Sequence, residues 1–577
     1  MRRALHLAEQ PIWMIPLILA WLSLFHAPLL SDGVSFDGRV VINEMSLTLM
    51  EEINMKENRM NSTPQFPQSL PQFPQSLWRA SSEMPSFPAL KEDHTTDVAI
   101  VGGGITGITT AYLLTKAGYK VTLLEAGELF VGTTGFTTAK ITVQHGLIYH
   151  DLVTNFGEEA ARLYYQSNKE ALKWIIQTAE ELKLSCGLTS EAAYLYADEG
   201  DEKTLKQLED EFKAYTRIGL PGEWQDHISL PLRVGGAIKV PGQARFHPLQ
   251  YLKGLLDVIL EKGGVIYEHT MIGEQVDKDG GKLTLYTEQS KHKISCRHAV
   301  SASHFPFYDG GALYFARLHA ERSYCLAIDP ETDYEGGMYL SAGDPTRSLR
   351  AVEWNGKKLV IVGGDNHKTG QGICTHGHYE NLEKFAGELL GIRGIPFRWS
   401  TQDLITLDRV PYIGKTAEDE EIYFATGFRK WGMTNGTLAA RMIADGIQRQ
   451  NNPYKELYDP SRFKARPSIK NFIVHNANVA KELVAGKVEI VHKKTQDLEP
   501  DQGAVVFHDG RRVGAYRDPE GKLHLVDRTC THMGCETEWN NGDRSWDCPC
   551  HGSRYSYDGE VLEGPATVPL TRLEAEK

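Results

Sequence analysis

Cysteine is scarce in this chain, with eight residues among 577. Small secreted proteins that are held together by disulfides have a much higher cysteine content, so the chain does not belong to that class. The low content does not by itself indicate a redox compartment. The length allows about four domains, and a hydrophobic fraction of 41% is ample for large cores.

The chain also lacks an excess of positive charge. Its formal net charge is −13, and it contains no basic tract with interleaved aromatic residues. Proteins that bind nucleic acid need such tracts, because lysine and arginine neutralise the phosphates. We therefore expect no nucleic-acid partner.

Long apolar runs are absent except near the N-terminus, where Pro11–Leu30 follows Arg2 and Arg3. This run has the features of a signal peptide, a twin-arginine signal or a membrane anchor, but no convincing small-x-small cleavage site follows it. Alternatively, translation starts at Met55. We expect a cytoplasmic protein, with membrane attachment or export through residues 11–30 as the alternative.

Residues 1–94 are interpreted as an N-terminal extension. Within it, residues 64–77 repeat the sequence Pro-Gln-Phe-Pro-Gln-Ser-Leu twice in tandem. Proline-rich segments of this kind are extended and lack a core of their own, so we expect the repeat to be disordered.

Two histidine- and cysteine-containing boxes lie close to the C-terminus. The first contains Cys530 and His532, and the second contains Cys548 and His551. Two thiolates and two imidazoles suit a [2Fe–2S] cluster with Cys₂ on one iron and His₂ on the other. The same ligand types also suit a tetrahedral zinc site.

The residues around these ligands resemble a Rieske domain of the high-potential kind. The boxes here are Cys-Thr-His-Met-Gly-Cys and Cys-Pro-Cys-His-Gly-Ser, and Met533 stands where the family usually has leucine. The resemblance implies that Cys530, His532, Cys548 and His551 bind the cluster. It also implies a disulfide between Cys535 and Cys550. The hydroxyl groups of Ser553 and Tyr555 are expected to form hydrogen bonds that raise the reduction potential of the cluster. Short strands within Ala504–Tyr516 and Lys522–Val526 fit an antiparallel domain.

We expect no mononuclear iron domain of the Rieske oxygenase type after these boxes, because about 26 residues follow His551 in this sequence, too few for one. Cys374-Thr375-His376 repeats half of the first box, but the next cysteine is Cys530. His376, His378 and Glu380 could be two histidines and a carboxylate for iron, but we expect them in a solvated loop instead.

A nucleotide-binding pattern begins at residue 97. The apolar run Asp97–Val101 leads to Gly102, Gly104 and Gly107, then to a helical stretch, a second strand and Glu125. Glycines at this spacing let the backbone approach a pyrophosphate at a helix N-terminus, and the acid binds ribose hydroxyls. No second Gly-x-Gly-x-x-Gly follows a strand elsewhere, as most NAD(P)H-dependent flavoprotein reductases would require.

Further motifs resemble the FAD-dependent D-amino acid oxidase and glycine oxidase superfamily. Residues 132–140 are small and hydroxylated, and include Thr133, Thr134 and Thr138. Downstream, residues 408–414 and a strand ending at Gly427 precede a helix over Thr437–Ile447. In that family this block returns to the nucleotide-binding fold, and its helix N-terminus faces the flavin. A helix dipole there stabilises an anionic flavin.

The middle of the chain gives weaker signals. His247 precedes Pro248, and we expect it to begin a helix rather than to do chemistry. Residues 363–367 are interpreted as a polar turn, either at a pocket or at the surface. Arg429 and Lys430 lie where the family places the loop beside the flavin. Each is a candidate for binding a substrate carboxylate or a carbonyl of the flavin ring. We assign no catalytic residue.

These patterns predict an α/β FAD-binding Rossmann-type domain with an α+β substrate domain, plus a C-terminal all-β Rieske domain. The expected boundaries are 95–448 for the FAD-dependent domain, 449–484 for a linker and 485–577 for the Rieske domain. The expected cofactors are FAD and a [2Fe–2S] cluster. The expected function is oxidation of a small amine or amino acid, with electrons leaving through the cluster to an external acceptor. The alternative is an electron-transfer or redox-sensing protein without a small-molecule substrate.

Overall fold

The structure, a computed structural model, describes residues 70–288, 290–372, 375–417, 420–462, 465–488 and 493–574. The chain separates into two compact units, Met1–Pro64 and Gln65–Lys577, and all described residues belong to the second unit. The predictions for the apolar run 11–30, for a start at Met55 and for residues 64–69 of the repeat therefore lie outside the described residues.

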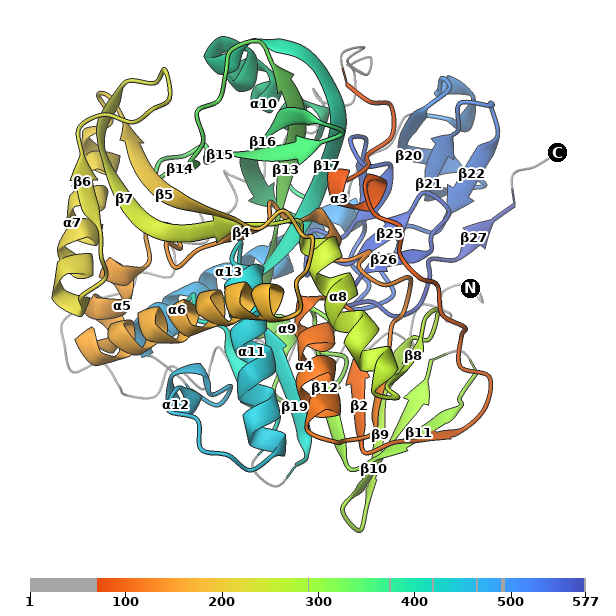
Figure 1. Cartoon of the computed structure of the whole chain (residues 1–577). Coiled ribbons are helices and arrows are strands. Elements are labelled where there is room, and N and C mark those ends of the chain that lie inside the picture. Colours follow the sequence, from red (N-terminus) through yellow and green to blue (C-terminus); the bar gives the residue numbers. More distant parts are fainter. Residues whose placement is uncertain are drawn as a thin grey trace, which may run out of the picture. The chain divides into compact units, whose positions relative to one another are not determined.

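A six-stranded sheet forms the centre of the nucleotide-binding part (Figure 1). Its strand order is β18-β19-β12-β2-β3-β8, and all neighbours are parallel except the edge pair β18 and β19. The bounds are β2 (Val98–Val101), β3 (Val121–Leu124), β8 (Val265–Tyr267), β12 (His298–Ser301), β18 (Tyr412–Lys415) and β19 (Ile422–Thr426).

Three helices pack beside this sheet and carry apolar faces into the main core. They are α4 (Ile105–Lys116), α8 (Pro248–Glu261) and α11 (Gly432–Ile447). A small sheet with the order β1-β11-β10-β9 adjoins it. Its strands are β1 (His94–Thr95), β9 (Ile272–Asp279), β10 (Lys282–Thr287) and β11 (Lys293–Cys296). This α/β arrangement agrees with the Rossmann-type domain predicted from the glycine motif.

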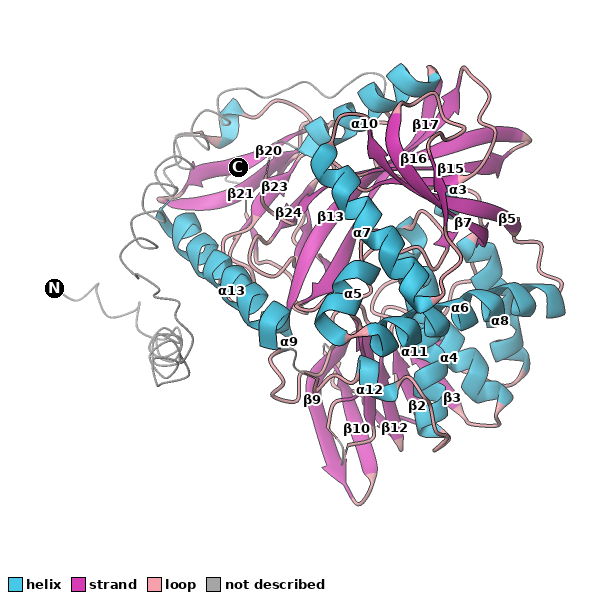
Figure 2. Ribbon diagram, turned by 90° about the vertical axis from the view of Figure 1, so that its left-hand side faces the viewer, coloured by secondary structure: helices cyan, strands magenta, loops and turns pink. Residues whose placement is uncertain are grey.

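A nine-stranded sheet forms the second large layer, with the order β17-β13-β16-β15-β14-β5-β7-β4 and β6 paired to β7. Its strands are β4 (Lys140–Ile141), β5 (Thr189–Asp198), β6 (Glu223–Gln225), β7 (Val234–Arg245), β13 (Leu318–Pro330), β14 (Met338–Ser341), β15 (Arg347–Trp354), β16 (Lys357–Lys368) and β17 (Ile392–Thr406). The accompanying helices, visible in Figure 2, are α5 (Tyr149–Phe156), α6 (Glu158–Glu181), α7 (Glu202–Ile218) and α10 (Thr375–Leu390). The short helix α9 (Tyr314–Arg317) leads into β13.

The strand pair β13 and β17 has two functional faces. The strands are antiparallel, with Arg322 opposite Gln402 and Ser323 opposite Thr401. Because side chains alternate between the faces of a strand, Arg322 and Gln402 share one face, and Ser323 and Thr401 share the other. Arg322 and Gln402 contact the C-terminal part of the chain, whereas Ser323 and Thr401 line a cavity.

Two four-stranded antiparallel sheets form the C-terminal part, which we call the cluster domain (described residues 493–574). One sheet contains β20 (Gln502–His508), β21 (Arg511–Arg517), β22 (Leu523–Val526) and β27 (Arg572–Leu573). The other contains β23 (Glu538–Asn540), β24 (Ser545–Asp547), β25 (Arg554–Ser556) and β26 (Val561–Glu563). The predicted all-β domain is confirmed.

The expected disorder of the repeat is wrong for its second copy. Leu77, at the start of α3 (Leu77–Ala80), and the following Trp78 are both 0% exposed. Arg398 of β17 donates to the carbonyl oxygens of Pro71 (2.5 Å) and Gln72 (2.7 Å). Burial of two large apolar side chains and these backbone contacts offset the entropy of ordering the segment.

The region expected to be a linker contains two helices, α12 (Lys455–Tyr458) and α13 (Ala465–Val488). Side chains of α13 bond to the preceding domain: Asn471 donates to the carbonyl of Leu407 (2.7 Å), and Asn476 donates to the carbonyl of Ala316 (3.1 Å). Among the described residues, none of the helices is both long enough and apolar enough to cross a membrane.

Candidate functional site

A cavity of about 690 Å³, which we call the main cavity, begins at the glycine-rich turn after β2. Gly102 and Gly104 line it. Gly102 has φ +108°, and a Cβ there would lie 2.4 Å from the carbonyl oxygen of Ala302. A Cβ on Gly104 would lie 3.0 Å from Thr134 Oγ1. Since α4 begins at this turn, its free backbone N–H groups favour an anionic ligand such as a pyrophosphate.

The other residues predicted to bind FAD fall into two groups, those that line the main cavity and those that do not. Glu125, Thr133, Thr134 and Thr138 line the main cavity with the glycines. Glu125 accepts hydrogen bonds from the backbone N–H of Gly103 (2.7 Å) and Gly127 (3.0 Å). Burial raises the pKa of this carboxyl despite those bonds.

Gly107 and Gly427 are not part of the lining. A Cβ on Gly107 would lie 1.9 Å from the Gly102 carbonyl oxygen, so this glycine serves close packing of helix against strand. Gly427 has φ +76°, and its neighbours Thr426 and Phe428 line the cavity instead.

One part of the lining of the main cavity, which we call the charged end, carries opposite charges. Arg429, Lys430 and Asp403 line it there. The Lys430 ammonium donates to Ser323 Oγ and lies 3.8 Å from the Asp403 carboxylate. Arg429 Nη1 is buried and has no hydrogen-bond partner. A ligand with an anionic group would supply the partner that this guanidinium lacks.

Two carboxyl groups near these cations differ widely in pKa. Burial raises the pKa of Asp403, which is 4% exposed, to about 7. Burial acts in the same direction on Glu321, but a hydrogen bond from His319 and the charges of Lys430 and Arg429 lower its pKa to about 2. Asp403 can therefore change its protonation state near neutral pH, whereas Glu321 stays ionised.

The two predicted ligand boxes form adjacent loops of the cluster domain. Each loop closes on itself, with Gly534 N–H donating to the Cys530 carbonyl (2.9 Å) and Gly552 N–H donating to the Cys548 carbonyl (3.1 Å). Cys530 and Cys548 are 2% and 1% exposed, and both are free thiols. Their interaction with each other lowers the pKa of Cys530 and raises that of Cys548. The loops thus bring two buried sulfurs together.

The two candidate imidazoles lie beside each other. The ring centroids of His532 and His551 are 5.1 Å apart, and the planes are at 88°. His551 Nδ1 is buried without a hydrogen-bond partner, which fits a nitrogen that binds a metal. The ring of Phe315 in α9 packs edge-on against both histidines, at 5.6 Å from His551 and 5.9 Å from His532.

The predicted disulfide between Cys535 and Cys550 is present. The sulfurs of these two residues and of Cys548 all lie within 4.8 Å of one another. Disulfide-bonded sulfurs are not thiolates, so only Cys548 of this group is available as a ligand. Tyr555 Oη lies 3.2 Å from Cys530 Sγ, and Ser553 Oγ accepts a hydrogen bond from Ala566 N–H (3.0 Å).

The second ligand loop lies directly on the β13–β17 pair. Gln402 Nε2 donates to the Gly552 carbonyl (2.9 Å), and the Gln402 carbonyl accepts from Thr133 Oγ1 (3.0 Å). Gly552 approaches β13 so closely that a Cβ on it would lie 2.4 Å from Ala320 Cβ. One residue, Gln402, therefore contacts both the lining of the main cavity and the loop that carries His551.

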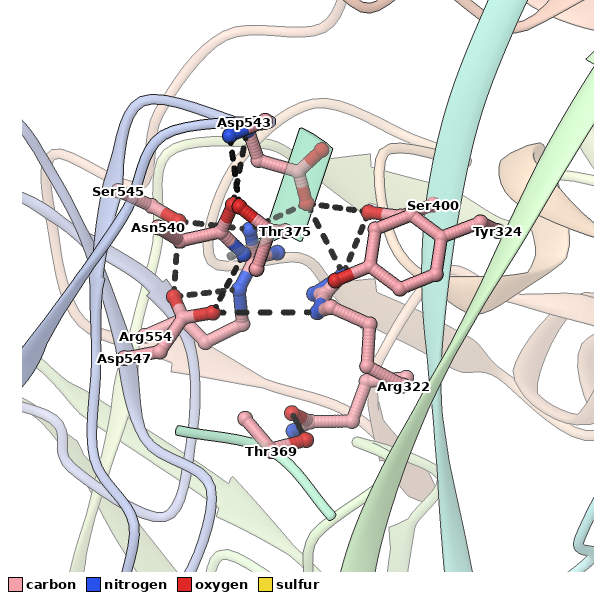
Figure 3. Close-up of polar contacts among 12 residues, drawn as sticks. Arg322, Tyr324, Thr369, Thr375, Ser400, Asn540, Asp543, Ser545, Asp547 and Arg554 are labelled. Carbon is pink, nitrogen blue, oxygen red and sulfur yellow. Dashed lines mark hydrogen bonds and ion pairs between the residues drawn. The ribbon is translucent and has the colours of Figure 1, made fainter. Parts of the chain in front are cut away.

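A buried network of charges fixes this arrangement (Figure 3). Arg322 of β13 is 0% exposed and lies 3.2 Å from Glu563, 3.5 Å from Asp543 and 4.0 Å from Asp547. Arg554 of the cluster domain holds the same three carboxylates at 2.9–3.1 Å. The close-up shows Ser400 of β17 beside Arg322, with Arg322 Nη1 donating to its hydroxyl (2.8 Å). Three carboxylates are thus shared by arginines from the two domains.

Two family models match this chain. The family model described as FAD dependent oxidoreductase matches residues 97–446. The chain belongs to this family. The model described as Rieske [2Fe-2S] domain matches residues 488–574. The protein is therefore an FAD-dependent oxidoreductase with a Rieske domain, and it uses FAD and a [2Fe–2S] cluster.

Relatives and solved structures support the two assignments. The chain is 47% identical over 498 residues to the Rieske 2Fe-2S iron-sulfur protein YhfW of Bacillus subtilis (strain 168). The aligned residues cover 86% of this chain and 97% of YhfW. It is 23% identical over 405 residues to gamma-glutamylputrescine oxidoreductase of Escherichia coli (strain K12), covering 63% of this chain and 87% of the relative. The fold is similar to that of glycine oxidase from Geobacillus kaustophilus, with a TM-score of 0.54, 19% identity, and coverage of 64% of this chain and 99% of the other.

Both cofactors fit the residues present. The glycines that exclude a Cβ, the N-terminus of α4 and Glu125 suit the phosphates and ribose of FAD. Two adjacent buried thiols and an imidazole nitrogen without a partner suit a cluster with mixed ligands better than zinc in this family context.

Two expectations for the middle of the chain are wrong. His376 and His378 lie buried in α10 rather than in a solvated loop, because His378 Nδ1 bonds to Asp365 Oδ2 (2.7 Å). Cys374 lies outside the described residues. Residues 363–367 belong to strand β16 rather than to a turn, because they pair with β13 and β15. Gly363, Gly364 and Asn366 of this strand line the main cavity.

The expectation for His247 is confirmed. It lies at the N-cap of α8, its side chain accepts from Gln250 N–H (3.3 Å), and it does not line the main cavity. Residues that the sequence did not reveal are Asp403, Gln402, His304 and the cluster-domain segment 561–567. Asp403 alone had a weak signal, as the one carboxylate of the segment 392–406.

Proposed function

We propose that this protein oxidises a small amine or amino acid at the main cavity and passes the electrons through its cluster to an external acceptor. FAD supplies hydride acceptance and the cluster supplies single-electron transport. The observation that supports the proposal most strongly is the β13–β17 pair, which has the charged end of the main cavity on one face and the cluster loop on the other.

The charged end of the cavity is suited to a zwitterionic or cationic substrate. Arg429 Nη1 would bind a substrate carboxylate, since it is buried and has no other partner. Asp403 would hold the amino group, and its pKa of about 7 would let it accept a proton from a substrate ammonium. Lys430 would fix Asp403 in place at 3.8 Å.

We assign the cofactor roles as the motifs predict. Cys530, Cys548, His532 and His551 would bind the cluster, and Ser553 and Tyr555 would tune it. The residues assigned to FAD are Gly102, Gly104, Glu125, Thr133, Thr134 and Thr138, with Gly107 and Gly427 shaping the turns beside them. We propose domain limits of 95–448 and 485–577, joined by the segment that carries α12 and α13.

An anaerobic titration with a panel of primary and secondary amines and α-amino acids tests the proposal. At least one compound should bleach the flavin absorbance, and Arg429→Met should weaken the apparent affinity for carboxylate-bearing substrates but not for amines without a carboxylate. Arg441→Met is the matched control, because Arg441 lies on α11 and does not line the cavity. If no small compound bleaches the flavin while a reduced protein partner does, the chain is an electron carrier or redox sensor instead.

A further inference from the structure

We propose that the cluster domain forms one wall of the FAD site, so that cluster loading strengthens FAD binding and bound FAD protects the cluster. The proposal deepens the proposed function and rests on its assignment of the cofactor residues. It concerns a segment of the cluster domain, residues 561–567, which we call the wall segment.

The wall segment lines the same cavity as the glycine-rich turn. It starts in β26 and continues through Gly564 and Pro565. A Cβ on Gly564 would lie 3.7 Å from Phe305 Cβ, so the segment packs against residues that follow β12. The lining of the FAD cavity is thus built from two parts of the chain that are more than 400 residues apart in sequence (Gly104 and Glu563).

One cluster-ligand loop bonds to the wall segment itself, and the other bonds to Val568, the residue that directly follows it. From the first loop, Thr531 Oγ1 donates to the carbonyl of Val568 (2.6 Å). From the second loop, Ser553 Oγ accepts from Ala566 N–H (3.0 Å). Thr531 lies between Cys530 and His532, and Ser553 is two residues after His551. A change in the geometry of either loop therefore displaces an end of the segment.

The wall segment carries a buried polar atom without a partner, on a residue that lines the cavity. Glu563 Oε1 bonds to Arg322 (3.2 Å) and Arg554 (3.0 Å), while Glu563 Oε2 is buried and has no partner. Nε2 of His304, on the opposite domain, is likewise buried without a partner, and both residues line the cavity. Buried polar atoms without partners are rare in proteins, and a polar cofactor in this cavity would supply the missing partners.

These contacts couple the two cofactors. Ligation by residues of both loops fixes their positions relative to each other, because each loop supplies one cysteine and one histidine. The wall segment is then already ordered when FAD binds, so FAD binding costs less conformational entropy. Coupling between two sites is reciprocal, and its usual size is about 5- to 150-fold in affinity.

The full-length protein allows a direct test. The dissociation constant of FAD is measured from flavin fluorescence in cluster-loaded protein, in protein whose iron has been removed by a chelator, and in Cys548→Ser. We expect FAD binding to be about 5- to 150-fold weaker in both cluster-free forms. The same constant in loaded and cluster-free protein would overturn the proposal.

The reciprocal measurement does not depend on a stable cluster-free protein. The rate of cluster bleaching by a chelator is followed with and without saturating FAD, and FAD should slow it. Equal rates would overturn the proposal. Neither measurement uses a substrate. Their results therefore do not depend on whether the protein oxidises amines.

One variant tests the route through the wall segment. Thr531→Val keeps all four ligands and removes the bond to Val568. The same hydroxyl lies 3.1 Å from Tyr555 Oη, so the EPR signal is used only to show that the cluster is still bound. In cluster-loaded protein the variant should weaken FAD binding, whereas Thr571→Val, which changes an exposed threonine of the same domain, should not. An unaltered FAD affinity in Thr531→Val would contradict the route.

Discussion

Replacing Arg322 tests whether the two domains are held together by buried charge. Arg322 is fully buried and faces Asp543, Asp547 and Glu563 at 3.2–4.0 Å. Breaking a buried ion pair by removing one partner costs about 3–5 kcal/mol, because the remaining charges stay buried without compensation. Arg554 still contacts all three carboxylates, so we expect Arg322→Met to lose about 3 kcal/mol, the lower end of that range.

Urea unfolding of the full-length protein, followed by circular dichroism, measures this loss. Arg572→Met is the control, because Arg572 forms an ion pair with Glu560 at 2.7 Å in which both side chains are 58% exposed. Exposed pairs contribute about 0–1 kcal/mol. The reasoning about the buried network would be refuted if Arg322→Met lost no more stability than the control.

Three further variants test the cluster and the charged end of the cavity. His551→Cys should lower the cluster potential toward the value of about −400 mV typical of all-cysteine clusters, with substrate-driven flavin bleaching intact, as measured by EPR-monitored redox titration. Tyr555→Phe removes the hydroxyl 3.2 Å from Cys530 Sγ. It should lower the potential by about 65–130 mV, because a hydrogen bond to a charged group contributes about 1.5–3 kcal/mol and about 1.4 kcal/mol equals about 59 mV for one electron. Asp403→Asn should change the pH dependence of stability: burial raises the pKa of Asp403 from 3.8 to about 7, so the folded state binds more protons than the unfolded state between these values. Stability from this group is therefore lost as the pH rises through that window, and the variant should be less destabilised at pH 8 than at pH 5.

Each of these variants has a contradicting result. An unchanged potential in His551→Cys would remove this histidine from the ligand set. Tyr557→Phe is the control for Tyr555, since Tyr557 packs on Tyr516 and His524 and not on a candidate ligand. Equal potentials in the two tyrosine variants would contradict the role of Tyr555. A pH-independent effect of Asp403→Asn on the urea midpoint would show that this carboxyl does not titrate in the window.

The sequence predicted those parts of the site that depend on local geometry. The turn at Gly102 and Gly104 needs glycine because neighbouring backbone leaves no room for a Cβ, and that requirement is visible in the sequence itself. The boxes around Cys530 and Cys548 likewise place the candidate ligands at fixed offsets within two short loops. Local requirements of this kind leave motifs, and the motifs predicted both cofactors and the fold class.

Contacts between distant segments left no such motif. Gln402 is an ordinary polar residue in a strand, and its bonds to Gly552 and Thr133 exist only because two domains pack together. His378 is buried because Asp365, on a neighbouring strand, accepts its hydrogen bond. The prolines and asparagines between residues 449 and 484 indicated a linker, whereas α13 forms there and bonds to the preceding domain. Amino-acid composition alone does not show which surface of the protein a helix packs against.

The order of reduction after rapid anaerobic mixing with a substrate tests the central claim most directly. A compound that bleaches the flavin in the titration is mixed with oxidised protein, the flavin absorbance is followed, and frozen samples are examined for the EPR signal of the reduced cluster. The account predicts that the flavin is reduced first and that the cluster signal follows in the same molecules. A cluster signal that precedes any loss of flavin absorbance would contradict it.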